Sequence, residues 1–406
     1  MTHFLRDILR QPEELRRAIE LLAGPNGAGR GALEAASAAI RGARHVYLTG
    51  IGSSWHAALN VSMLFHGHAN PVYLHDAAEL LAFATFPKDS AMIIISRSGK
   101  STEIVQLAAK ARKAGVKVIG ITNAPEGTLA KEAHHAIVVP IQFDHAISVN
   151  TYTTLALAAG LLAHSVVAGV ASHENAEETD SSGENRPRND KAGVLQQGAG
   201  PRVLSSPRQE EKRQQAAALQ KDLAEALLKA FAEVGRAIPK WQEQIAGSGW
   251  LKPNSTTYFL ARGSSLGSAY ESRLMWEEGV KTPATAIGMG GFRHGPQEVI
   301  AKEMRFCIWI DGAQMREQDL AVARDLRKLG ARAMLIGQKL PEDAGDLVFQ
   351  LPAIPGEWQF LIDIIPAQLV AERLAGLSGV DCDTFRLCSF VVEDEGGLLP
   401  KEKTRN

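Results

Sequence analysis

Residues 91–123 read AMIIISRSGKSTEIVQLAAKARKAGVKVIGITN, and this stretch decides the fold class. Residues 91–96 are a continuous β-branched run, as expected of a strand that is covered on both faces. Residues 102–115 have the spacing of an amphipathic helix, with basic residues late and Gly115 as its stop. Residues 116–123 then read as the next strand. A strand, a helix and a second strand in this order predict a parallel α/β sheet.

The same alternation of strands and helices extends on both sides of this stretch. Further strands are expected at 45–50, 71–76 and 136–140. Helices are expected at 12–41, 53–68, 77–84 and 151–170. The pattern predicts a doubly wound sheet with helices on both faces.

Residues 173–212 differ sharply from what precedes them. Charged residues, Gly, Ser and Pro dominate this stretch, and apolar residues are sparse. We interpret it as a polar, flexible linker between domains. Helical patterning resumes at about 213–245. The predicted domains are therefore a first unit at 1–172 and a second unit at 213–406.

The second unit repeats the first. The strand, Gly-Ser-Ser turn and helix around Gly52, Ser53 and Ser54 recur around Gly263, Ser264 and Ser265. Residues 305–338 likewise repeat the pattern of 91–123. The second copy keeps the strand and the helix but has DGAQMR at 311–316, where the first has SRSGKS at 96–101. Loss of the hydroxyls from one copy indicates that the first loop serves a ligand.

Composition narrows the class of protein. The chain has 406 residues with a net charge of −1, so no electrostatic footprint favours nucleic acid or an anionic membrane. The amphipathic N-terminus lacks the apolar core of a signal peptide, and no apolar run reaches about 18 residues. Three cysteines do not form a disulfide framework, and Cys382 and Cys388 have poor zinc spacing. We expect a cytoplasmic protein without a structural metal.

The loop at 96–101 has the features of a phosphate site. It joins a strand to a helix N-terminus, where unpaired amide groups and the helix dipole favour an anion. Gly99 permits a positive φ, and the serine hydroxyls are short donors. The alternative is a capping turn in which Ser101 or Thr102 caps the helix. Neither GxGxxG nor GxxxxGK[ST] is present, so a dinucleotide or nucleoside triphosphate has no direct support.

Several stretches together resemble the SIS (sugar isomerase) superfamily, in particular tandem-SIS phosphosugar proteins such as the isomerase halves of glucosamine-6-phosphate synthases. They are TGIGSSWHAA, SRSGKSTEIVQLAAKARKAGVKVIGITN, ISVNTYTTLALAAG, LARGSSLGSAYESRLMWEEG, FRHGPQEVI and GVDCDTFRL. The resemblance implies two flavodoxin-like SIS domains, each a parallel sheet flanked by helices. It places the phosphate at Ser96, Arg97, Ser98, Gly99 and Ser101, and the sugar at Gly52, Ser53, Ser54 and, by a looser alignment, Ser148.

The resemblance also assigns the chemistry. The catalytic glutamate falls on Glu278 and the ring-opening histidine on His294. A helix over 265–279 would bring Glu271, Met275 and Glu278 to one face, with Gly279 as its C-cap. Without the resemblance, Glu278 would be a solvated helix-end acid and His294 a turn histidine. In this family the histidine can come from the partner subunit, which implies a homodimer, and no metal or organic cofactor is needed.

The chain also departs from the family pattern. A lysine of the synthases is replaced by Met275, and their C-terminal lysine falls on Ser389 or Phe390. The chain starts with the SIS part, so we expect no glutamine amidotransferase activity. These departures make the deaminase and deglycase branches better matches than a synthase-type isomerase.

Two functional hypotheses follow. The first is an enzyme, an aldose–ketose isomerase or a deaminase/deglycase acting on a sugar or amino-sugar 6-phosphate by Glu/His acid–base chemistry. The alternative is a non-catalytic phosphosugar-binding regulatory protein. Neither hypothesis requires nucleic acid or a membrane as a partner.

Overall fold

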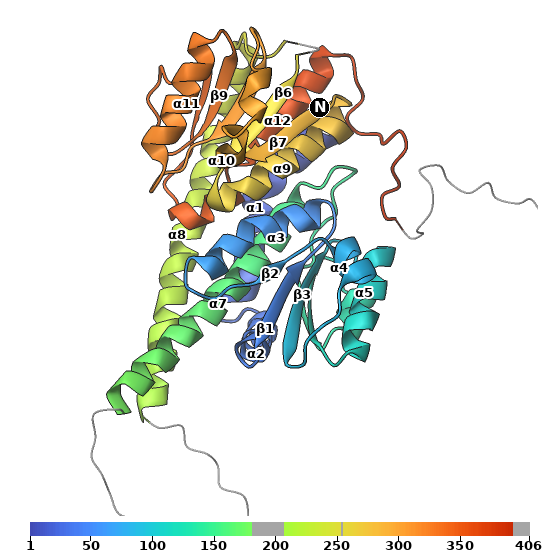
Figure 1. Ribbon diagram of the computed structural model, residues 1–406, viewed down its shortest axis with the longest axis vertical. Helices are drawn as coiled ribbons and strands as arrows, with labels where there is room; N and C mark the ends of the chain where they lie inside the picture. Colours follow the sequence, from blue (N-terminus) through green and yellow to red (C-terminus); the bar gives the residue numbers. More distant parts are fainter. Residues whose placement is uncertain (181–206, 253–254, 393–406) are drawn as a thin grey trace, which may run out of the picture.

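Two parallel five-stranded sheets, one in each half of the chain, form the frame of the molecule (Figure 1). The computed structural model describes residues 1–180, 207–252 and 255–392. The first sheet consists of β1 (His45–Thr49), β2 (Tyr73–Leu74), β3 (Ser90–Ser96), β4 (Lys117–Thr122) and β5 (His135–Val138). The second consists of β6 (Thr257–Ala261), β7 (Ala284–Gly288), β8 (Arg305–Trp309), β9 (Arg332–Gly337) and β10 (Leu347–Gln350).

The two sheets have the same topology. The strand orders are β2-β1-β3-β4-β5 and β10-β9-β8-β6-β7, and all pairs are parallel. Numbered within each half, both are the flavodoxin-like order 2-1-3-4-5. The order reverses between β1 and β3, and between β6 and β8, so the crevice at the strand ends opens there. The predicted fold class of two flavodoxin-like domains is confirmed.

Helices cover both faces of the first sheet. They are α1 (His3–Ala23), α2 (Arg30–Arg41), α3 (Ser53–His66), α4 (Ala77–Phe83), α5 (Thr102–Lys113), α6 (Thr128–Glu132) and α7 (Asn150–Asp180). In β3, Ile93 and Ile95 enter the core that α1, α2, α3 and α7 complete, whereas Met92 and Ile94 face α4, α5 and α6. Coverage on both faces explains why this strand is apolar throughout.

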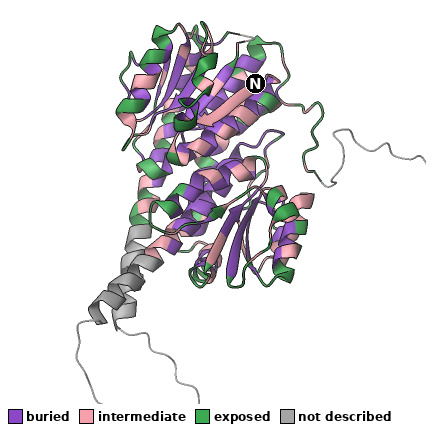
Figure 2. Cartoon of the chain, in the orientation of Figure 1, coloured by how far each residue is buried: buried purple, intermediate pink, exposed green. Residues whose placement is uncertain are grey.

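The second half is built in the same way. Its helical elements are α8 (Pro207–Ala246), η1 (Gly263–Ser265), α9 (Leu266–Met275), η2 (Trp276–Val280), α10 (Met289–Phe292), η3 (Pro296–Val299), α11 (Arg316–Lys328), η4 (Gly356–Leu361) and α12 (Ile365–Leu377). Phe306 and Ile308 face a local core with α10 and α11, whereas Cys307 and Trp309 join the core that contains Ile93. The two halves therefore share one central core, visible as the buried helices between the sheets (Figure 2).

The structure changes three expected boundaries. The helix expected over 12–41 is two helices, α1 and α2, separated at a turn that contains Gly24 and Pro25. The linker expected at 173–212 is shorter, because 173–180 belong to α7 and 207–212 to α8. The remainder, 181–206, lies outside the described residues.

One part of α7 meets the length and hydropathy criteria of a membrane span. Asn150–Ala168 has a mean hydropathy of 1.4, because its Ala, Leu and Val residues outweigh the interspersed polar ones. Within the protein, 83% of this window is buried, and α7 packs against α1, α2 and α3. The stretch is therefore accounted for as a core helix of the first domain.

Candidate active site

The loop after β3 is tightly wound around Gly99. Gly99 has φ 61°, and a Cβ there would lie 3.2 Å from the Leu129 Cβ. Ser96 Oγ accepts a hydrogen bond from the Gly99 amide at 3.1 Å, and Ser98 Oγ accepts one from the Lys100 amide at 3.2 Å. Both serines are buried. The two hydroxyls thus stabilise the loop, and glycine supplies a conformation that other residues rarely adopt.

Neither hydroxyl at the start of α5 caps the helix. Ser101 occupies the N-cap position, but its side chain makes no capping hydrogen bond. The Thr102 hydroxyl accepts instead from the Gln106 side chain at 2.9 Å. The capping-turn alternative is therefore wrong for this loop, and the Ser101 hydroxyl stands beside the helix N-terminus, where an anion is favoured.

Arg97 turns inward, whereas Lys100 is exposed. The Arg97 guanidinium donates to Ser148 Oγ at 3.0 Å and to the Phe390 carbonyl at 2.5 Å. Its central carbon lies 3.9 Å from the centre of the Phe390 ring. Burial lowers the pKa of Arg97, while the carboxylates of Asp144, Glu278 and Glu271 oppose that shift. Arg97 is thus the cation at the point where both domains and the C-terminal segment meet.

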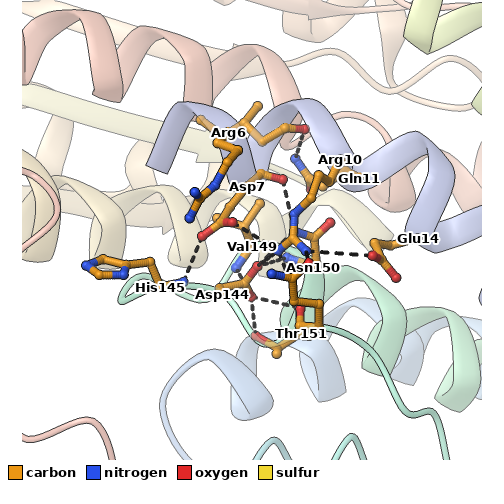
Figure 3. Close-up of polar contacts among 12 residues, drawn as sticks. Arg6, Asp7, Arg10, Gln11, Glu14, Asp144, His145, Val149, Asn150 and Thr151 are labelled. Carbon is orange, nitrogen blue, oxygen red and sulfur yellow. Dashed lines mark hydrogen bonds and ion pairs between the residues drawn. The ribbon is translucent and has the colours of Figure 1, made fainter. Parts of the chain in front are cut away.

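The start of α7, directly after Ser148, is held by the buried carboxylate of Asp144, which was not among the expected site residues (Figure 3). Asp144 accepts hydrogen bonds at the start of α7 from the amides of Val149, Asn150 and Thr151 and from two of their side chains. The loop is also tied to α1, because Asp7 accepts from the His145 amide at 2.7 Å. These bonds fix the backbone around Ser148. The sequence signal was an Asp a few residues before a helix start, which is too common to single out.

The Gly-Ser-Ser turn at 52–54 lies beside the loop that follows β3. Gly52 has φ 58° and ψ −133° and precedes α3, which begins at Ser53. Ser54 is buried. Because β1 pairs with β3 in parallel, the turn and the loop lie at the same edge of the sheet, at the switch point. In the second domain Gly263 repeats the left-handed conformation, with φ 54°.

The equivalent loop of the second domain is closed by its own side chain. Asp311 accepts hydrogen bonds from the backbone amides of Ala313, Gln314 and Met315, at 3.2, 2.9 and 2.8 Å. The amide groups that would face an anion there already face this carboxylate. Arg316 donates to the carbonyls of Gln338 and Lys339. The amides of this loop therefore face a carboxylate, whereas those of Gly99 and Lys100 in the first domain face serine hydroxyls.

Glu278 lies on a π-helical turn rather than in a regular α-helix. The helix α9 ends at Met275 and continues as the π-turn Trp276–Val280. The expected C-cap at Gly279 is wrong, because the turn runs on to Lys281, which has φ 57°. Such π-turns occur often at functional sites. Glu278 is the middle residue of this turn, and the charge of Glu271, seven residues earlier in α9, acts on its carboxyl group.

The surroundings of Glu278 perturb its protonation. Burial and the negative charge of Glu271 raise the pKa of Glu278 to about 7, against the opposing charges of Arg97 and Lys281. The carboxyl group is therefore not the solvated helix-end acid that its sequence position alone favours. At neutral pH it is populated in both protonation states, as a group that accepts and returns a proton requires.

No hydrogen bond or ion pair joins His294 to Glu278 among the described residues. His294 lies between α10 and η3, is exposed, and its backbone amide donates to Gly291 at 3.1 Å. Its side chain makes no hydrogen bond or ion pair with a described residue. Among the residues described, no group of three or more His, Cys, Asp or Glu side chains is arranged to hold a metal ion.

The C-terminal segment crosses from the second domain to the candidate phosphate loop (residues 96–101) of the first. Lys281 donates to the carbonyls of Glu278 and of Thr384, the latter at 2.9 Å. Further on, Phe390 covers Arg97, and the Val392 carbonyl accepts from the Thr102 amide at 3.0 Å. A phosphate that binds this amide must replace the Val392 carbonyl. Phe390, one of the two residues on which the family lysine was expected to fall, thus packs against Arg97 with an apolar side chain.

A cavity of about 530 Å³ opens beside the Glu278 turn rather than over the phosphate loop. Lys281, Thr282, Asp381 and Arg386 are among its lining residues. The loop itself is covered by the C-terminal segment, which explains why the cavity does not extend over Ser101.

The raised pKa of Glu278 predicts how stability depends on pH. A carboxyl group with a raised folded-state pKa stabilises the fold below its unfolded value of 4.5 and loses that contribution as pH rises toward about 7. Compared with Glu278→Gln, the wild type should therefore lose stability between pH 4.5 and 7, and the difference should then level off. Thermal unfolding of both proteins across this range measures it. A constant difference would show that Glu278 titrates as an ordinary surface acid.

Comparison with known proteins matches the first domain to a family. Residues 39–165 match the SIS domain family, and this span contains the Gly-Ser-Ser turn, the phosphate loop and Ser148. Over 390 residues, 94% of this chain, the sequence is 23% identical to the isomerizing glutamine–fructose-6-phosphate aminotransferase of Pyrobaculum aerophilum. The chain spans 56% of the length of that relative.

Solved structures share the fold over nearly the whole chain. The C-terminal domain of glucosamine-fructose-6-phosphate aminotransferase from Francisella tularensis has a TM-score of 0.74 at 20% identity, covering 94% of this chain and 98% of that one. Glucosamine-6-phosphate deaminase from Thermotoga maritima has a TM-score of 0.71 at 19% identity, covering 96% and 99%. At such identities the likeness shows the fold.

Proposed function

Residues 39–165 of this chain form a SIS domain, and from that premise we propose an enzyme that processes a sugar or amino-sugar 6-phosphate by acid–base chemistry. The observation that carries the proposal is the position of Glu278. Its surroundings raise the pKa of its carboxyl group to about 7. Its charge interacts with that of Arg97, which belongs to the candidate phosphate loop of the other domain. A charged anchor in one domain and a proton-transferring carboxylate in the other are what an isomerase of phosphorylated sugars requires.

In the proposed reaction the phosphate of the substrate binds the loop. The amides at the start of α5 and the hydroxyl of Ser101 donate to phosphate oxygens, and Arg97 supplies a positive charge. The Gly-Ser-Ser turn and Ser148 contact the sugar. These remote contacts hold C1 and C2 of the open-chain sugar at the second domain. In this step the C-terminal segment gives up its bond to Thr102.

Glu278 then moves a proton between neighbouring carbons. Its carboxylate takes the proton from one of C1 and C2, and the C–H electron pair becomes the C1–C2 double bond of an enediol or enolamine. A second proton passes between the heteroatoms on C1 and C2, and the protonated carboxyl returns its proton to the other carbon. If C1 or C2 bears an amine, the rearranged product releases ammonia or an amino acid by hydrolysis. A pKa of about 7 suits both halves of this transfer at neutral pH.

Opening of the sugar ring is assigned to His294. Because this histidine is exposed and makes no side-chain hydrogen bond with a described residue, we propose that it acts in the site of a second copy of the chain. In this role its imidazole moves a proton between the anomeric hydroxyl and the ring oxygen. The functional unit is then a homodimer in which each site uses both chains.

The alternative function is a phosphosugar-binding regulatory protein without turnover. One arrangement favours it: Phe390 lies over Arg97, and the Val392 carbonyl accepts from the Thr102 amide. The resemblance to the synthases implies a lysine at Ser389 or Phe390, and neither residue can supply its charge. A thermal-shift screen with hexose, hexosamine and fructosamine 6-phosphates, followed by NMR of any stabilising compound, separates the two functions. Stabilisation with product formation supports the enzyme, whereas stabilisation without any product supports the regulator.

Ser101 offers a direct test of the phosphate site. Ser101→Ala should raise the dissociation constant for the sugar phosphate by roughly 10- to 100-fold, as expected for one hydrogen bond to a charged group. Titration calorimetry with the phosphorylated sugar measures the effect. Gln314→Ala, in the corresponding loop of the second domain, is the matched control and should bind as the wild type does. Equal affinities of the Ser101 variant and the wild type would place the phosphate elsewhere.

A further inference from the structure

A buried histidine and glutamate join the two domains. His56 Nδ1 lies 2.7 Å from Glu271 Oε2, and the two residues are 4% and 0% exposed. His56 belongs to α3 of the first domain, and Glu271 belongs to α9 of the second. Buried charged groups are costly unless they are paired, so this contact is a specific feature of the interface between the domains.

The two helices approach each other unusually closely at this point. An ideal Cβ on Gly267 would lie 2.2 Å from the His56 carbonyl oxygen and 2.1 Å from Asn60 Oδ1. The Asn60 side chain in turn donates to the Tyr152 hydroxyl at 2.6 Å. The contact between His56 and Glu271 therefore sits in a rigid crossing whose separation only glycine permits.

The same two helices carry the two parts of the candidate site. The helix α3 begins at Ser53 in the sugar-lining turn, and His56 lies in its first turn. The helix α9 leads directly into the π-turn with Glu278. A shift of one helix against the other would therefore change the distance between bound sugar and carboxylate. The hydrogen bond between His56 and Glu271 joins the two helices and therefore resists such a shift.

We propose that His56 and Glu271 are positioning residues for the reaction. In this inference, which rests on the proposed function, their hydrogen bond fixes the sugar-lining turn relative to Glu278, and Glu271 keeps a negative charge beside it. The hydrogen bond joins Nδ1 of His56 to Oε2 of the Glu271 carboxyl group. The second carboxylate oxygen, Oε1, is buried and has no hydrogen-bond partner among the described residues, so its charge is little screened.

The titratable groups that act on Glu278 in the described part of the chain bear on this proposal. They are Glu271 and Glu277 on its own helix, Arg97 from the first domain, Lys281 after the turn and Cys388 in the C-terminal segment. Glu271 is the acid with the largest influence, ahead of both cations, and Glu277 has the smallest effect of the four charged side chains that shift Glu278. Removal of the Glu271 charge should therefore make Glu278 a stronger acid.

Glu271→Gln is the informative variant, because it removes the charge and keeps an oxygen that accepts from His56. The acidic limb of the pH profile of kcat/KM, which reports the pKa of Glu278, should move to lower pH by about one unit, because a nearby like charge has been removed. Glu277→Gln, which removes a more exposed charge on the same turn, is the matched control and should move the limb by less than half as much. An unmoved limb in Glu271→Gln, or equal shifts in both variants, overturns the proposal.

A second measurement needs no turnover and separates this inference from the proposed function. The stability difference between each protein and its Glu278→Gln derivative levels off near the folded-state pKa of Glu278. In the Glu271→Gln background this plateau should begin about one pH unit lower than in the wild type. An earlier plateau without any turnover would support the charge effect while rejecting the enzyme. An unchanged plateau overturns the inference even if the enzyme is active.

Discussion

Glu278→Gln should lower turnover by at least about a thousandfold while leaving sugar-phosphate binding within a few-fold of the wild type. The amide keeps the size of the carboxyl group but neither accepts nor returns a proton at neutral pH. The phosphate contacts belong to the other domain, so binding should persist. Product formation is followed by NMR in deuterated water, and binding is followed by thermal shift with the same compound.

The controls for this result lie on the same turn. Glu277→Gln removes the neighbouring carboxylate, which is exposed, and should retain most of the activity. Incorporation of solvent deuterium at C1 or C2 should disappear with Glu278 and persist with the control. Full activity of Glu278→Gln would reject the assigned role of this residue, whereas binding without turnover in the wild type would favour the regulatory function.

Gly267→Ala should destabilise the protein by about 3 kcal/mol or more. The new Cβ would lie 2.2 Å from the His56 carbonyl oxygen and 2.1 Å from Asn60 Oδ1, and a backbone atom in a packed crossing does not move cheaply. Helix propensity alone predicts the opposite sign, because alanine in a helix is about 1 kcal/mol better than glycine. The sign of the change therefore decides whether the α3–α9 crossing is as tight as described.

Gly235→Ala is the matched control for this prediction. Gly235 is an exposed residue of α8, and a Cβ there would approach only Pro12, at 3.9 Å. This variant should be neutral or stabilised by up to about 1 kcal/mol. Chemical denaturation of both variants at one pH measures the difference. If both glycines tolerate alanine equally, the domains do not pack through Gly267.

The fold was predictable because its signals are local. The apolar run of β3 reflects coverage on both faces, and the strand, turn and helix pattern around Gly52 recurs around Gly263 with the same positive φ. Boundaries were less predictable: polar composition at 173–180 indicated a linker, yet these residues continue α7. A polar composition shows that a segment has little apolar surface to bury. It does not exclude a helix, because the end of a long helix can extend beyond the core without burying apolar side chains.

The candidate site was predictable in part. The loop from Ser96 to Ser101 is one continuous segment, so its sequence carried the signal of an anion site. The contact of Arg97 with Phe390 joins residues almost three hundred positions apart, and no local pattern predicts it. The carboxylate of Asp144 likewise acts through a loop whose role emerges only when α1 and α7 are packed together.

The sequence by itself determined the two α/β units and the loss of the hydroxyl loop from the second unit, and its resemblance to the SIS superfamily singled out Glu278 as the residue to examine. Tertiary structure alone decided the state of that residue. Its pKa of about 7 arises from burial between two domains and from Glu271, Arg97 and Lys281, which the chain brings together from separate elements. Hydroxyl side chains, glycines and the periodic spacing of apolar residues can be read from a single segment. Desolvation and charge interactions depend on distances that exist only after the domains have packed.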